Sequence, residues 1–193
     1  MIPLLLKIRL KNITYLSRGK RGIIYKAIYK KQKVSIKTKL PSSDAKGRIK
    51  NEGKFLKILN KYKIGPELIK SGKNYLMYRY IEGEFLPDFL DRETDKEKKK
   101  KIIIKILKQI RILDKLKINK LEFIRPLKHI FIKNEKITMI DFERCYYTDS
   151  PKNVTQFCQF LINRKLIKKN IKLLQQYKEN QSEKNFKEIL NTI

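Results

Sequence analysis

The sequence predicts an α+β fold, with an antiparallel sheet in the first part of the chain and mainly helices in the second. Residues 14–40 and 67–79 contain short runs of strand-like alternation separated by turns. Residues 44–62 and 94–116 instead carry apolar residues at helical spacing. The length of 193 residues leaves room for one domain, or for two small lobes that share a cleft.

The net charge sets the class of partner that the chain attracts. It is +29, from 48 Lys and Arg against 19 Asp and Glu. Such a charge favours polyanions, among them nucleic acid, anionic lipid and phosphorylated ligands. A compositional preference for Lys and Ile explains the same charge without any partner. RNA binding through a basic surface is therefore one expectation and compositional bias is the other.

The cysteine and histidine content argues against a zinc site and a disulfide framework. Cys145 and Cys158 are not paired as Cys-x-x-Cys, and His129 is the single histidine. This pattern favours a reducing, cytoplasmic setting. The apolar opening at residues 2–6 is too short for a signal peptide or a membrane span, so we expect a soluble protein with no membrane partner.

A glycine turn separates the first two predicted strands. It contains Gly19, Lys20 and Gly22. Glycines at such a turn let backbone amides approach a phosphate, and Lys20 adds positive charge. An ordinary hairpin turn also favours glycine, so the pattern fits both interpretations.

A lysine and a glutamate follow at positions that suit a phosphate site. Alternation over Val34-Ser35-Ile36-Lys37 puts Val34 and Ile36 on one face of a strand and Lys37 on the other. Facing a cleft, Lys37 supplies a point charge for a phosphate. Glu52 lies 15 residues later on the predicted helix, where it can hold the Lys37 ammonium or remain a solvated glutamate.

The next segments suggest a boundary between two lobes. The helix region ends at Gly65-Pro66, and residues 67–71 and 74–79 form a predicted hairpin around Gly72. A turn at residues 82–84 follows. We place the first lobe at residues 1–80 and the second at 81–193.

The second part is predicted to be helical around one more strand. Thr94 can cap the helix over residues 94–116, and Ser150-Pro151 suits the start of another helix. One or two basic amphipathic helices are expected over residues 165–193. Residues 137–140, between the helix over 94–116 and the helix that starts at Ser150-Pro151, form a predicted strand. This strand ends at Asp141, a position that holds a carboxylate still for Mg²⁺.

These motifs, in this order, resemble the protein-kinase-like fold over about residues 15–161. The chain looks most like the small archaeal predicted serine/threonine kinase-like proteins, which are akin to the RIO kinases, the KEOPS-complex kinase and the lipopolysaccharide kinases. The resemblance implies a minimal bilobal fold, with an antiparallel-sheet N-lobe and a truncated helical C-lobe.

The resemblance also implies roles for individual residues. Lys37 would contact the α- and β-phosphates of ATP, Glu52 would be its helix partner, and Asp141 would bind Mg²⁺. Glu143 replaces the glycine of the Asp-Phe-Gly motif. The residues expected around the adenine are Tyr78, Arg79 and Ile81.

The resemblance weakens at the catalytic loop. Glu122 is the carboxylate available as a general base, and it precedes Asp141 by 19 residues. Leu127 stands five residues after it, where a kinase carries a metal-binding Asn, so the second metal ligand is missing or displaced to His129. Glu122 can alternatively pair with Arg125 or with a nearby lysine.

The expected function is that of an ATP-dependent serine/threonine kinase-like phosphotransferase, with Mg·ATP bound between two lobes. Its acceptor would be a hydroxyl group of a protein or a small molecule. The alternative is a weakly catalytic pseudokinase or an ATPase that binds RNA or a larger complex through its basic surface.

Overall fold

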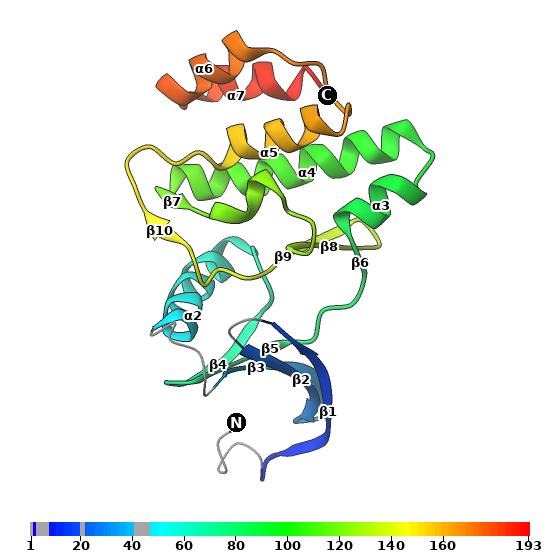
Figure 1. Cartoon of the computed structure of the whole chain (residues 1–193), viewed down its shortest axis with the longest axis vertical. Helices are drawn as coiled ribbons and strands as arrows, with labels where there is room; N and C mark the ends of the chain where they lie inside the picture. The colour runs from blue at the N-terminus through cyan, green and yellow to red at the C-terminus, as the bar shows by residue number, and fades with distance from the viewer. Residues whose placement is uncertain (1, 3–7, 20–21, 41–46) are drawn as a thin grey trace. The chain divides into compact units, whose positions relative to one another are not determined.

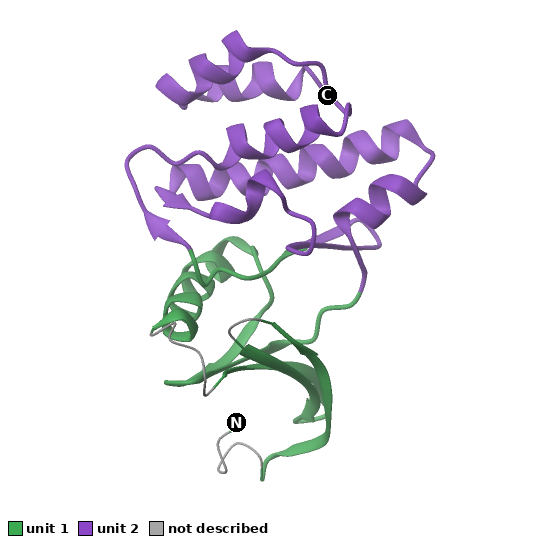
Figure 2. Cartoon of the chain, viewed as in Figure 1, with its two compact units in different colours: residues 1–82, 138–144 green, residues 83–137, 145–193 purple. Residues whose placement is uncertain are grey.

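The computed structural model describes residues 2, 8–19, 22–40 and 47–193 and divides the chain into two compact units. Unit 1 comprises residues 1–82 and 138–144, and unit 2 comprises residues 83–137 and 145–193 (Figure 2). The first change of unit lies two residues after the boundary placed from the sequence. The sequence did not indicate that residues 138–144 return to unit 1.

Unit 1 is built on a five-stranded antiparallel sheet (Figure 1). Its strands are β1 (Leu10–Arg18), β2 (Gly22–Tyr29), β3 (Gln32–Lys39), β4 (Leu68–Ser71) and β5 (Tyr75–Arg79). Their spatial order is β1-β2-β3-β5-β4, and each neighbouring pair is antiparallel. Strand β3 therefore lies at the centre, with a hydrogen-bonded neighbour on each side.

The two faces of β3 pack against different partners. Val34 and Ile36 are fully buried in one cluster with Met77, which confirms the predicted alternation at these two positions. On the other face Lys37 lies opposite Leu76 of β5. Leu76 belongs to a second buried cluster with Ile49, so this face of the sheet packs against a helix.

That helix is α2 (Arg48–Leu59), which continues as the 3₁₀ turn η1 (Asn60–Tyr62). The predicted helix began at residue 44; residues 41–46 lie outside the described part of the chain. The Asn60 side chain fixes the connection to β4. Its amide donates to the carbonyl oxygens of Ile64 and Pro66, and its oxygen accepts from the Leu68 N–H.

Unit 2 is mainly helical. Its helices are α3 (Leu86–Arg92), α4 (Lys96–Lys115), α5 (Asn153–Asn163), α6 (Ile171–Glu179) and α7 (Glu183–Leu190), with the 3₁₀ turn η2 (Leu121–Ile124). Its short strands are β6 (Glu84–Phe85), β7 (Ile118–Asn119), β8 (Ile130–Lys133) and β10 (Tyr146–Tyr147), and β9 (Lys136–Met139) runs into residues of unit 1. The described residues thus form an α+β structure, as the sequence predicted. None of their helices combines the length and apolar character needed to cross a bilayer.

Two helix starts differ from the sequence-based expectation. Asp95, not Thr94, caps α4, because its carboxylate accepts hydrogen bonds from the N–H groups of Glu97 and Lys98. Helix α5 begins at Asn153 rather than at Pro151. A longer-range contact sets this start, since the Asn153 side chain is held by Asp114 of α4.

Unit 2 contains a buried polar network that ties α4 to the helices after it. The Asp114 carboxylate accepts hydrogen bonds from the Asn153 amide at 2.7 Å and from the Tyr177 hydroxyl at 2.9 Å. Arg111 in turn donates to the Tyr177 oxygen at 3.0 Å. Burial raises the pKa of Asp114, and the hydrogen bonds from Asn153 and Tyr177 oppose this rise. The backbone N–H groups of Asn153 and Val154 also donate to this carboxylate, so both of its oxygens have buried donors.

Replacing Tyr177 with Phe is expected to lower the free energy of unfolding by about 2 kcal/mol, because one oxygen of Asp114 and one N–H of Arg111 lose a buried partner. Urea denaturation of the two proteins measures this difference. The exposed Tyr62 provides the matched control, and Tyr62→Phe should stay within about 0.5 kcal/mol of wild type. Equal effects of the two substitutions would contradict a structural role for the network.

Candidate functional site

The candidate site lies within unit 1 and starts from a lysine on the central strand. Lys37 extends from β3 toward α2, where its ammonium donates to the Glu52 carboxylate at 2.7 Å. Both side chains are largely withdrawn from solvent, with exposed fractions of 11% and 4%. The sheet fixes the Lys37 backbone, and the packed face of α2 fixes Glu52. The sequence-based pairing of these two residues is therefore present in the structure.

Asp141 reaches the same ammonium from a distant part of the sequence. It follows β9, and its Oδ1 accepts from Lys37 Nζ at 3.0 Å. The backbone of Asp141 is left-handed, with φ of 64°. Aspartate tolerates this region better than most residues, but such positions cluster at functional sites.

The next residue anchors this segment within unit 1. Phe142 is fully buried. A Cβ at Gly65 would lie 3.0 Å from the Phe142 ring, and Gly65 itself has φ of +79°. Glycine is therefore required at residue 65 both by its backbone conformation and by the close approach of the ring.

Glu143 completes the cluster and was not predicted to belong to it. Its carboxylate accepts from Lys37 Nζ at 3.2 Å. Its carbonyl oxygen accepts from the Asn51 amide at 3.0 Å, so α2 also holds the backbone here. One feature of the sequence could have indicated this role: Glu143 stands where the Asp-Phe-Gly motif of the resembling kinase-like family has glycine.

The cluster places three carboxylates around one ammonium. Burial lowers the pKa of Lys37, but the charges of Glu52, Asp141 and Glu143 outweigh it and hold the pKa well above its ordinary value. Burial raises the pKa of Glu52, and the charge of Lys37 opposes that rise. With all four groups ionised the site carries an excess of two negative charges. A divalent cation matches this excess.

The geometry of the carboxylates also suits a cation. One oxygen from each of Glu52, Asp141 and Glu143 lies within 4.8 Å of the others, so these three can share a metal ion. Asp141 is 31% exposed whereas Glu143 is 6% exposed. Asp141 is thus the carboxylate best placed to meet a ligand from outside. Mg²⁺ prefers one or two carboxylates together with phosphate oxygens and water, which fits this distribution.

The residues expected around an adenine lie along and after β5. Tyr78 is buried, and burial followed by the charge of Glu52 raises its pKa. Ile81 packs against the cluster that contains Tyr78. The Arg79 side chain makes two hydrogen bonds to the Glu67 carboxylate, at 3.2 and 2.9 Å. Their part in nucleotide binding stays a prediction.

The strands on either side of the glycine turn, β1 and β2, pair in antiparallel fashion. The Gly19 N–H donates to the carbonyl oxygen of Gly22 at 2.9 Å. A Cβ at Gly22 would lie 2.7 Å from the Thr38 carbonyl oxygen, so the close approach of β2 to β3 requires glycine there. Lys20 lies outside the described residues. Packing therefore explains Gly22, and phosphate binding by the turn stays a prediction.

Glu122 and His129 both belong to unit 2. Glu122 lies on η2 and accepts from the fully buried Lys120 ammonium at 2.9 Å. Of the pairings left open by the sequence, the structure thus has a nearby lysine as its partner. The His129 N–H donates to the Pro126 carbonyl oxygen just before β8. His129 is not a member of the carboxylate group that can hold a metal ion, and its role as a ligand stays a prediction.

Comparison of the chain with models of known protein families gave no match, and comparison with curated proteins likewise gave none. The case for a function therefore rests on the residues themselves.

Replacing Lys37 with Met is expected to destabilise the protein by about 3 kcal/mol at neutral pH, because three clustered carboxylates lose their common counter-charge. Without the cation, folded Glu52 binds a proton more readily than unfolded Glu52, whose ordinary pKa is 4.5. The stability of the variant should therefore recover as the pH falls toward that value. Thermal denaturation between neutral pH and about pH 5 tests this recovery.

Lys39→Met is the matched control, because Lys39 lies two residues along the same strand and is absent from the ion pairs found among the described residues. It should leave the melting temperature near that of wild type at both pH values. If the difference in melting temperature between wild type and Lys37→Met stayed constant with pH, the lysine would not be what stabilises the ionised carboxylates.

Proposed function

We propose that the protein is an ATP-dependent, kinase-like phosphotransferase. The observation that supports the proposal is the single ammonium of Lys37, bonded at once to Glu52 of α2 and to Asp141 after β9. Phosphoryl transfer requires a cation that binds phosphates and a carboxylate that binds a metal. In this proposal the lysine on the central strand, held by the helix glutamate, is the cation. The partly exposed aspartate beside it is the carboxylate. The kinase-like bilobal fold belongs to the same proposal.

Each residue of the cluster has a defined task in this proposal. Lys37 would bind phosphate oxygens, and Glu52 would keep its ammonium oriented and charged. Asp141 would hold Mg²⁺, with Glu143 as a second carboxylate nearby. Bound Mg·ATP supplies the transferable phosphoryl group and the metal charge that stabilises it.

Glu122 is the proposed general base for the acceptor hydroxyl. A carboxylate can accept a hydroxyl proton, and the Glu122 carboxylate is held in place by the Lys120 ammonium at 2.9 Å. The same ion pair is also compatible with a second candidate function, in which Glu122 is not a base. The protein would then bind or hydrolyse ATP without transferring phosphate to a hydroxyl. In that case Glu122 and Lys120 form a structural pair.

Asp141→Asn is expected to weaken Mg·ATP binding by at least about tenfold, because a neutral amide oxygen binds Mg²⁺ more weakly than a charged carboxylate does. Lys37→Ala should weaken binding further through lost phosphate contacts. Isothermal titration with Mg·ATP measures both effects. Asp88→Asn removes an exposed carboxylate of α3 and serves as the control. Unchanged affinity in all three variants would reject the proposed site.

Glu122→Gln separates the two candidate functions. If Glu122 is the base, the variant should bind Mg·ATP like wild type but lose about a hundredfold or more in phosphate transfer, because general-base catalysis contributes about that factor. Transfer is followed from labelled ATP to added protein and small-molecule acceptors. ATP hydrolysis without transfer, unchanged in Glu122→Gln, would favour the second candidate function.

A further inference from the structure

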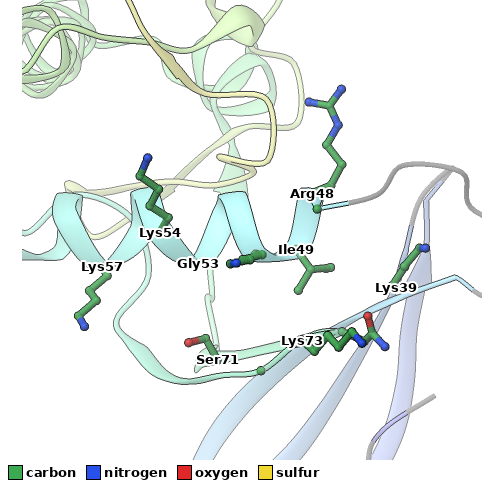
Figure 3. A pocket seen from close by; sticks show the side chains of 12 residues that line it. Lys39, Arg48, Ile49, Gly53, Lys54, Lys57, Ser71 and Lys73 are labelled. Carbon is green, nitrogen blue, oxygen red and sulfur yellow. The ribbon is translucent and has the colours of Figure 1, made fainter.

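Unit 1 contains a second feature, separate from the Lys37 cluster. A hollow of about 740 Å³ lies between α2 and the turn that joins β4 to β5 (Figure 3). Ile49 and Gly53 line it from the helix, and Ser71 lines it from the strand side. Gly53 lets the helix lie close to the sheet, because a Cβ there would be 2.9 Å from a Leu76 methyl group. The size is within the range of ligand-binding cavities.

The charge of this hollow is entirely of one sign. Six of its lining residues are basic and none of the lining residues that the structure describes is acidic; the basic ones are Lys39, Arg48, Lys50, Lys54, Lys57 and Lys73. This contrasts with the Lys37 cluster, in which carboxylates outnumber the cation. A ligand of opposite charge is therefore expected at each place: a metal ion at the cluster and an anion at the hollow.

The cations are spread along the hollow and do not converge on one point. Lys50, Lys54 and Lys57 follow one another at helical spacing on α2, and a rise of 1.5 Å per residue separates the first from the last by about 10 Å. Lys54 and Lys57 leave the helix in different directions, and Lys39 and Lys73 stand on the strand side (Figure 3). A compact anion cannot contact all of these spread cations at once, whereas a chain of successive phosphates can pass from one to the next.

We propose that this hollow, with the lysine row of α2, binds the sugar–phosphate backbone of a single RNA strand. Lysine acts as a point charge toward phosphate and carries little base specificity. No aromatic residue is among the described residues that line the hollow, so base stacking does not contribute there. Binding should therefore be independent of base sequence and strongly dependent on salt. The proposal does not depend on the proposed kinase-like function.

The test uses the whole chain and a short fluorescein-labelled oligouridylate, with binding measured by fluorescence anisotropy between about 50 and 200 mM KCl. The test variant carries Lys50→Ala, Lys54→Ala and Lys57→Ala. The matched control carries Lys96→Ala, Lys100→Ala and Lys108→Ala, three exposed lysines of α4 that remove the same charge from a helix of unit 2.

The test variant should bind about tenfold or more weakly, and its salt dependence should fall by about 2 in the slope of log K against log salt, because each phosphate contact contributes about 0.7. The control should keep most of the affinity and slope of wild type. Circular dichroism of each variant checks that its helices are intact.

Equal losses in the two variants would overturn the proposal, because they would assign binding to overall charge. No loss in the test variant would overturn it as well. A further outcome is that a phosphopeptide or inorganic polyphosphate displaces the labelled oligouridylate at concentrations where a second, unlabelled RNA does not. That result would overturn the proposal and assign the hollow to another ligand. Loss of Mg·ATP binding in Asp141→Asn with unchanged RNA binding is expected, since the two sites are separate.

Discussion

The Lys37 ammonium is the one group on which the candidate site depends. It pairs with three carboxylates, which come from α2 and from the segment after β9. Like charges this close repel by several kcal/mol even in a partly polar interior. The lysine therefore holds residues 138–144 in unit 1, and it does so together with the burial of Phe142 and the hydrogen bond from Asn51.

The same arrangement explains how one cluster can be both stable and receptive. The buried carboxylates of Glu52 and Glu143 are tied to the lysine, while Asp141 keeps part of its surface in solvent. A metal ion that binds Asp141 adds positive charge where the cluster has a negative excess. Its binding would reduce the repulsion among the carboxylates. The arrangement of the three carboxylates therefore suits a divalent cation.

Charge is divided unevenly over unit 1. The Lys37 cluster is acidic, although the whole chain carries +29. The hollow beside α2 is basic, and the same helix contributes Glu52 to one and Lys50 to the other. The overall charge thus conceals two local environments of opposite sign. The net charge calculated from composition agrees with the basic hollow but does not indicate the acidic Lys37 cluster.

Periodicity and turn chemistry were sufficient to predict the strands of the sheet, the helix after them and the buried stripe of α4, because these depend on neighbours in the sequence. The sequence also pointed to Lys37 and Glu52 as a possible pair, on a strand and on a helix, and to Asp141 at a strand end. Only the tertiary structure decided that Asp141 and Glu143 share the ammonium of Lys37, which lies more than 100 residues earlier. Helix α5 likewise begins where Asp114 holds Asn153. Local pattern cannot specify such contacts, because they form only when distant segments pack together.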